Sequence, residues 1–210
     1  MPEPSASVPV ILIGGPPLSG KTTAARAMGL RLGRQIVSTD HLGEAARALT
    51  DPATHADLHA CNLTGHQDYY TAFSPEALLE QALGAHRALW PAVRAVINRH
   101  LNWAEPIIIE GWALLPDLLA SMASPKLRCV WIEVPEPTLR SRLEADASFA
   151  RGASDPALLI TRFVERSLRM QDWLRERVSL CGLPLIELSG REPPDQVASL
   201  CMEAMGIGLP

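Results

Sequence analysis

The sequence has little of several features that would point to particular classes of protein. Its four cysteines are widely spaced and form no CxxC pair, so a zinc site or a dithiol redox motif is not indicated. No apolar run approaches the roughly 20 residues that a membrane-spanning helix needs, and the first residues lack the basic segment that begins a secretory signal peptide. We therefore expect a cytoplasmic protein whose cysteines are reduced thiols.

An excess of charge of one sign is also lacking. The formal net charge of −4 gives no general attraction to nucleic acid or to an anionic membrane, so we expect neither as a partner. Among the 19 basic residues only Lys21 and Lys126 are lysines, and this excess of arginine can reflect genomic composition alone. Any surface that binds anions must therefore be a local one.

What the sequence does contain is a phosphate-binding motif over residues 15–23. Two glycines separated by four residues are followed by a lysine and a threonine. An apolar run leads into the motif and a helix-favouring run leaves it, which is the strand–loop–helix context that the motif needs. Such a loop turns backbone N–H groups toward an anion, and the helix N-terminus favours negative charge. The alternative is an ordinary glycine-rich turn before a helix.

The motif predicts ATP and Mg²⁺ as ligands. Lys21 would reach the β- and γ-phosphates, and the Thr22 hydroxyl would hold Mg²⁺. Pro16 and Pro17 are unusual in such a loop because proline has no N–H to donate, so these two positions are not expected to face the phosphates. The predicted nucleotide-binding residues are Gly15, Ser19, Gly20, Lys21, Thr22 and Thr23.

Five short apolar segments alternate with helical segments along the chain. This alternation predicts a parallel sheet with helices on both faces, in a single α/β domain over residues 1–210. Pro91 predicts a kink or break over 87–91, and residues 1–7 are expected to form a short disordered lead. The expected strands are 9–13, 35–38, 107–110, 127–134 and 184–188, and the expected helices are 20–32, 40–49, 75–101, 113–121, 137–145, 156–180 and 194–205.

Two segments depart from this alternation. Residues 50–73 are polar and lack apolar periodicity, and we expect about 50–100 to form an insertion on the substrate side. Residues 146–155 have the composition of an exposed loop, and about 140–168 is expected to form a helical lid.

Two carboxylates are expected at the edge of the sheet where the phosphate loop lies. Asp40 follows the second strand, where it can orient or accept the proton of an alcohol, bind Mg²⁺, or cap a helix. Glu110 ends the third strand, where it can contact Mg²⁺, its water or the substrate, or be solvated at a strand end. Glu133, between two apolar residues, fits a structural role better. We predict Asp40 as a catalytic residue and Thr22 and Glu110 as the metal ligands.

Several arginines flank the expected lid loop. Guanidinium groups carried over a transferring phosphoryl group would stabilise its charge, whereas a solvated face paired with nearby acids is the alternative. Arg162, Arg166 and Arg169 share one helix face by their spacing. Arg142 and Arg151 are closest to the loop and are the predicted catalytic arginines.

Three segments together resemble P-loop small-molecule kinases: the phosphate loop, Ser38-Thr39-Asp40 and Ile108-Ile109-Glu110-Gly111. The chain looks most like the 2-phosphoglycerate kinase-related group, with chloramphenicol phosphotransferases and zeta-toxin kinases as wider relatives. The resemblance implies a P-loop three-layer αβα fold with strand order 2-3-1-4-5, which would bring Glu110 beside the phosphate loop. It also implies that Asp40 is the base or hydroxyl-orienting group, and it leaves the substrate open.

These features predict an ATP-dependent phosphotransferase that acts on a hydroxyl of a small molecule, which can be anionic, with help from Mg²⁺. The predicted catalytic residues are Lys21, Asp40, Arg142 and Arg151. One alternative is a nucleotide-binding regulatory protein or slow NTPase, and another is a kinase that modifies a toxin or antibiotic. The protein is expected to be a monomer or a homodimer.

Overall fold

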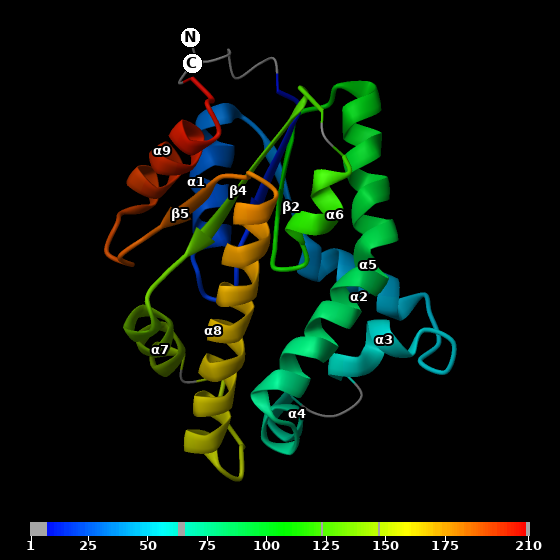
Figure 1. The fold of residues 1–210 in the computed structure, drawn as a ribbon, viewed down its shortest axis with the longest axis vertical. Helices are drawn as coiled ribbons and strands as arrows, with labels where there is room; N and C mark the ends of the chain where they lie inside the picture. Colours follow the sequence, from blue (N-terminus) through cyan, green and yellow to red (C-terminus); the bar gives the residue numbers. More distant parts are fainter. Residues whose placement is uncertain (1–7, 63–65, 123, 147, 209–210) are drawn as a thin grey trace.

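The computed structural model describes residues 8–62, 66–122, 124–146 and 148–208, and the lead predicted over 1–7 lies outside them. Figure 1 shows helices arranged around a central sheet. The strands are β1 (Val10–Gly14), β2 (Gln35–Ser38), β3 (Ile107–Glu110), β4 (Leu127–Glu133) and β5 (Leu185–Glu187). The helices are α1 (Lys21–Leu32), α2 (Thr39–Ala48), α3 (Ala56–His59), the 3₁₀ helix η2 (Ala60–Asn62), α4 (His66–Ala72), α5 (Pro75–Trp103), α6 (Pro116–Ala120), α7 (Glu136–Ala145), α8 (Pro156–Leu180) and α9 (Pro194–Ala204).

The five strands are parallel and lie in the order β2-β3-β1-β4-β5, which confirms the predicted order. Glu110 at the end of β3 is in register with Ile13 of β1 on one side and with Ser38 of β2 on the other. The ends of β2 and β3 therefore lie beside the end of β1, where the phosphate loop begins. This register brings the predicted carboxylates and the loop to one edge of the sheet.

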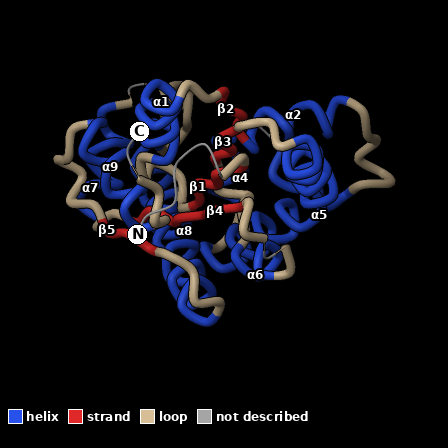
Figure 2. Tube along the Cα trace, turned by 90° about the horizontal axis from the view of Figure 1, so that it is seen from above, coloured by secondary structure: helices blue, strands red, loops and turns tan. Residues whose placement is uncertain are grey.

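Each face of the sheet is covered by its own set of helices. Successive side chains of a strand point to opposite faces, so Val10 and Leu12 pack with apolar residues of α5, α6 and α8, whereas Ile11 and Ile13 pack with those of α1 and α9. Figure 2 shows α1 and α9 on one side of the strands and α5 and α6 on the other. The predicted three-layer architecture is confirmed. Within the described ranges, no helix is both long and apolar enough to cross a lipid bilayer.

Helix α5 runs without interruption through Pro91, so a break at this position is not observed. Its axis changes direction along its length (Figure 1). Leu89, Val93 and Ile97 are all buried on the same side of the helix, while Pro91 itself is exposed. Packing on both sides of the proline therefore holds the helix together although one backbone hydrogen bond is missing.

The segment 50–73, for which the sequence predicts no helix, contains α3, η2 and α4. Few of its residues are apolar, but Leu58, Tyr69 and Tyr70 are all buried. These helices pack against α5 and α8, so the burial of a few large side chains orders a segment that has no apolar periodicity of its own.

Candidate active site

The phosphate loop connects β1 to α1 with a backbone that requires glycine. Gly15 and Gly20 have φ values of 141° and 103°, a region that side chains with a Cβ rarely adopt. A Cβ on Gly15 would also lie only 2.3 Å from the carbonyl oxygen of Ile132. Leu18 has a φ of 63° without being glycine, and strain of this kind is concentrated at functional sites.

Lys21, at the start of α1, is buried and reaches back over the loop. Its Nζ donates a hydrogen bond to the carbonyl oxygen of Pro16 at 2.5 Å. The unusual proline thus contributes its carbonyl where it has no N–H to offer. Burial lowers the pKa of Lys21 to about 8, the charges of Glu110 and Asp40 oppose this shift, and the positive charge of Arg166 adds to it. The ammonium group therefore lies in the field of both predicted carboxylates.

Two cavities meet at the phosphate loop. The larger cavity, of about 500 Å³, lies between the loop, α2, α5 and α8, and the smaller cavity, of about 390 Å³, lies along the start of α1. Leu18, Lys21 and Thr22 line both of them. The polar residues lining the larger cavity include Lys21, Asp40, His86, Glu110, Trp112 and Arg166.

Asp40 lies in the first turn of α2 with its carboxylate toward the larger cavity. The indole N–H of Trp112 donates to its Oδ1 at 2.9 Å. The alternative role as a helix cap is filled by Ser38, whose Oγ accepts the N–H of Asp40 at 3.2 Å. The carboxylate of Asp40 is thus oriented by Trp112 and is not used in capping the helix.

Glu110 is only 4% exposed and lines the same cavity. Among the described residues, no hydrogen bond or ion pair within 4.0 Å involves its carboxylate, and its influence on Lys21 is electrostatic. A Cβ on Gly111 would lie 1.7 Å from Thr39 Oγ1, so the glycine after Glu110 lets β3 approach the start of α2. This close approach brings Glu110 and Asp40 to one wall of the cavity.

These residues fit a magnesium–phosphate group. Mg²⁺ prefers oxygen ligands, and Glu110 offers a buried carboxylate without a protein partner while Thr22 offers a hydroxyl at the junction of the two cavities. Ser19 Oγ is buried and has no hydrogen-bond partner within the described residues. Such an unsatisfied hydroxyl is expected where a ligand supplies the hydrogen bond.

The two predicted catalytic arginines lie in different surroundings. Arg142 lines the smaller cavity, and its Nη1 donates to the carbonyl oxygen of Leu18 at 2.6 Å. Arg151 lies in the loop before α8, is exposed, and lines neither cavity. The structure therefore brings Arg142 to the phosphate loop and leaves Arg151 at the surface, where a catalytic role would require the loop to move.

Arg166 on α8 is, like Trp112, a residue of the larger cavity that was not predicted to belong to the site. It is 2% exposed, and its guanidinium carbon lies 4.8 Å from the ring centroid of Trp112, 4.9 Å from that of Phe163 and 5.3 Å from that of Tyr70. Each such contact stabilises a cation by about 0.5–2 kcal/mol. Arg166 is spaced like Arg162 and Arg169, so its own spacing did not distinguish it. The signal available was its place among the apolar positions of α8.

Arg162 and Arg169 behave differently from Arg166. Arg162 pairs with Glu165 on its own helix, and Arg169 pairs with Glu76 of α5. All four of these side chains are between 35% and 57% exposed. The expected alternative of a solvated, acid-paired face describes these two arginines but not Arg166.

His86 on α5 also lines the larger cavity. It is 4% exposed, its ring meets that of Trp112 edge-on at a centroid distance of 4.2 Å, and neither ring nitrogen has a hydrogen-bond partner among the described residues. Burial lowers the pKa of His86 to about 3, and the positive charges of Arg166, Lys21 and Arg87 act in the same direction. The imidazole is therefore neutral at physiological pH.

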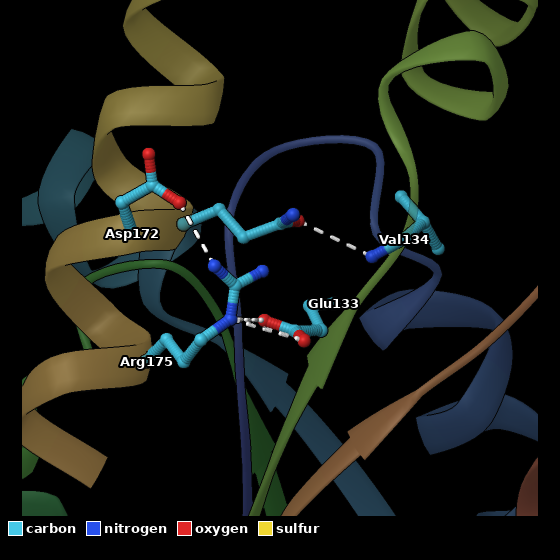
Figure 3. Close-up of polar contacts among 5 residues, drawn as sticks. Glu133, Val134, Asp172 and Arg175 are labelled. Carbon is cyan, nitrogen blue, oxygen red and sulfur yellow. Dashed lines mark hydrogen bonds and ion pairs between the residues drawn. The ribbon is translucent and has the colours of Figure 1, made fainter. Parts of the chain in front are cut away.

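Glu133 takes the structural role that its flanking residues suggested. Figure 3 shows it at the end of β4 facing Arg175 of α8. Arg175 Nε donates to both carboxylate oxygens, at 3.1 and 3.3 Å, and Nη1 donates to Asp172 at 2.9 Å. The N–H of the next residue, Val134, donates to Gln171 of α8 at 3.2 Å. These contacts attach β4 to α8.

Comparison with known proteins finds small-molecule kinases among the relatives, together with the tRNA dimethylallyltransferase of Pelodictyon phaeoclathratiforme, which is 28% identical over 210 residues and covers 95% of this chain and 61% of that protein. No protein-family model matches the chain. The 2-phosphoglycerate kinase of Pyrococcus horikoshii is 25% identical over 182 residues, covering 85% of this chain and 58% of that protein. The mevalonate-3-phosphate 5-kinase of Thermoplasma acidophilum is 25% identical over 158 residues, covering 74% of this chain and 77% of that protein. The chain thus spans less than two thirds of the length of its Pyrococcus relative.

Solved structures give the same class of fold. A sugar kinase from Janibacter sp. HTCC2649 superposes with a TM-score of 0.53 at 18% identity and covers 95% of both chains. At this identity the likeness concerns the fold alone. Together the fold and the relatives confirm the resemblance to P-loop small-molecule kinases, with 2-phosphoglycerate kinase among the proteins that the chain is similar to.

Proposed function

We propose that the protein transfers the γ-phosphoryl group of ATP to a hydroxyl of a small molecule. The observation that carries this proposal is the meeting of two cavities at Lys21 and Thr22. A phosphotransferase needs a nucleotide on one side of the phosphate loop and an acceptor on the other, and in-line transfer between them. The smaller cavity, with Arg142, suits the nucleotide side, and the larger cavity, with Asp40, suits the acceptor.

In the proposed reaction the acceptor hydroxyl lies against Asp40. Its oxygen forms a bond to the γ-phosphorus, its proton passes to the Asp40 carboxylate, and the bond from the γ-phosphorus to the bridging oxygen breaks to release ADP. The hydrogen bond from Trp112 fixes the orientation of the carboxylate that receives the proton. Asp40 thus positions and deprotonates the nucleophile.

The charge that develops on the transferred group is balanced by cations of the chain. Lys21 provides one, and Arg142, which already contacts the phosphate loop through Leu18, provides a second from α7. Thr22 and Glu110 would hold Mg²⁺, which would supply further neutralisation of the phosphate charge. Arg151 would join them only on closure of the 140–168 lid, which remains a prediction.

The regulatory alternative is weaker because of the larger cavity. A switch protein or slow NTPase requires loops that sense the γ-phosphate but no enclosed site beside it, whereas a volume of about 500 Å³ is typical of sites for small ligands. A kinase that modifies a toxin or antibiotic would use the same site and differs only in its acceptor. We expect action in the cytoplasm, without nucleic acid or membrane as a partner.

ATP consumption in the presence of Mg²⁺, screened over phosphorylated and unphosphorylated alcohols, tests the proposed function. At least one alcohol should raise ADP release well above the rate with water alone. If none does, the regulatory or NTPase alternative is favoured.

Asp40→Asn tests the assigned base. This variant should bind ATP with nearly unchanged affinity while transfer falls by about 10²–10⁴-fold, because the amide cannot take the proton. Unchanged transfer would contradict the role of Asp40. Asp172→Asn on the exposed side of α8 serves as the control, since that carboxylate lines neither of the two cavities at the phosphate loop and is ion-paired with Arg175.

A further inference from the structure

The larger cavity contains a buried cation that has no acidic partner. Arg166 is 2% exposed, and no ion pair within 4.0 Å involves it among the described residues. An arginine keeps its charge at any physiological pH, so deprotonation cannot relieve the cost of burying it. Buried charges are otherwise paired, and this arginine lines a cavity large enough for a ligand. The missing partner is therefore expected to be an anion from outside the chain.

The groups around Arg166 offer donors to the cavity. Arg166 Nη2 donates to the hydroxyl oxygen of Tyr70 at 2.7 Å, which leaves the hydrogen of that hydroxyl free to be donated onward. Arg166 Nε has no partner within the described residues, and the same holds for both ring nitrogens of His86. Arg166, Tyr70 and His86 form the charge-binding wall of the cavity. A ligand that accepts hydrogen bonds from these residues must be rich in acceptor oxygens.

Trp112 lies between the charge-binding wall and Asp40, the proposed base. Its ring covers the Arg166 guanidinium at 4.8 Å while its indole N–H is donated to Asp40. One side chain therefore separates the carboxylate that would hold the acceptor hydroxyl from the unpaired guanidinium. A single small molecule can carry a hydroxyl at one position and an anionic group at the other.

We propose that Arg166, together with the Tyr70 hydroxyl, binds an anionic oxygen group of the acceptor alcohol, either a phosphate or a carboxylate. The inference rests on the proposed kinase function and adds the specificity-determining residue. Arg166 binds the anionic group of the acceptor, and Asp40 binds its hydroxyl. Uncharged alcohols leave the guanidinium buried without a counter-ion, and the site discriminates against them for that reason.

The test compares three acceptors that share a carbon skeleton: glycerol, glycerate and glycerol 2-phosphate. The wild-type protein should favour one or both anionic compounds over glycerol in kcat/KM, and the two anionic arms distinguish carboxylate from phosphate. Arg166→Gln should lower kcat/KM for the favoured anion by about 100-fold, as expected when one partner of a buried charge pair is removed, and the preference for the anion over glycerol should fall with it. Arg162→Gln, on the same helix but partly exposed and already paired with Glu165, is the matched control and should leave all three rates unchanged.

Two further variants separate anion binding from support of the fold. Arg166→Lys keeps the charge without the planar fork and should recover part of the loss. Tyr70→Phe removes only the hydroxyl and should raise KM for the anion about tenfold without a matching change for glycerol. Equal losses for charged and uncharged acceptors, or no loss in Arg166→Gln, would overturn the inference.

Failure of the proposed function is recognised separately. If none of the three compounds accelerates ATP consumption, calorimetric titration of each into the ATP-free protein still tests the anion site. Binding of glycerate or glycerol 2-phosphate but not glycerol, lost in Arg166→Gln, supports the site. Absence of binding, or binding that Arg166→Gln leaves unchanged, overturns it.

Discussion

Glu110 and Glu133 end two buried strands at the same edge of the sheet, yet their surroundings differ. Both are nearly inaccessible, at 4% and 7% exposure. Glu133 receives two hydrogen bonds from Arg175, which Asp172 also holds (Figure 3). Glu110 has no such partner within the described residues and faces Lys21 across the larger cavity. One carboxylate is satisfied within the protein and the other is left open to a ligand.

The two arginines of α8 repeat this contrast nine positions apart. Arg175 is half exposed and carries two acidic partners, whereas Arg166 is buried among aromatic rings and has none. Burial alone therefore does not identify a functional charge in this protein. A buried charge whose partner is missing does so, because the fold bears a cost that only a ligand can relieve.

Glu110→Gln gives the largest expected difference between the two regions. It should lower phosphoryl transfer by about 10²–10³-fold, since one of the two residues proposed to hold Mg²⁺ is lost. The free energy of unfolding should change little, because among the described residues the carboxylate loses no hydrogen bond or ion pair within 4.0 Å and only its longer-range attraction to Lys21 is removed. Steady-state kinetics and urea unfolding measure the two quantities.

Glu133→Gln is the matched control for that variant. It should keep most of the activity and lose stability instead. Similar losses of activity in both variants would show that the two strand ends are not functionally distinct.

The sequence was sufficient for the sheet and for the edge on which the site lies. The apolar segments and the phosphate motif are local signals, and parallel strands bring their carboxyl ends together, so Asp40 and Glu110 could be found from position alone. The separation of Glu110 from Glu133 rested on flanking residues and on the resemblance to P-loop small-molecule kinases. The physical difference is the contact between Glu133 and Arg175. These residues are 42 positions apart, so the contact leaves no local signal in the sequence.

The spacing of Arg166 did not identify it either, although its place among the apolar positions of α8 was a signal. It shares its spacing with two exposed arginines, and what distinguishes it is contact with Tyr70 of α4 and Trp112 after β3. The segment that contains Tyr70 has too few apolar residues for its helices to be predicted. The charge-binding wall of the cavity is thus a tertiary feature, whereas the phosphate loop is a local one.

His86 allows the cavity to be compared with the surface by titration. Burial and the positive charges of Arg166, Lys21 and Arg87 lower the pKa of His86 from 6.5 to about 3. Between these two pH values the imidazole is protonated in the unfolded chain and neutral in the folded protein. This contribution to stability is complete above pH 6.5 and is lost progressively as the pH falls toward 3. Between pH 7.5 and 5 the loss should be about 2 kcal/mol.

Urea unfolding at the two pH values, in wild type and in His86→Gln, measures this effect. The variant should lose about 2 kcal/mol less than the wild type on acidification. His55→Gln, at an exposed position, should behave like the wild type. An identical pH dependence in wild type and His86→Gln would mean that the imidazole is not held neutral in the cavity.

The ion pair between Glu133 and Arg175 gives the smallest expected effect and defines the structural side of the comparison. A double-mutant cycle of Glu133→Gln and Arg175→Met should give a coupling free energy of about 1 kcal/mol, because Arg175 is half exposed and water screens the pair. Measured by urea unfolding, this coupling should weaken at high salt, whereas acceptor affinity should be unaltered in all three variants. A coupling near zero would mean that β4 is attached to α8 mainly through Gln171 and the apolar core; a change in acceptor affinity would mean that this region also contributes to the site.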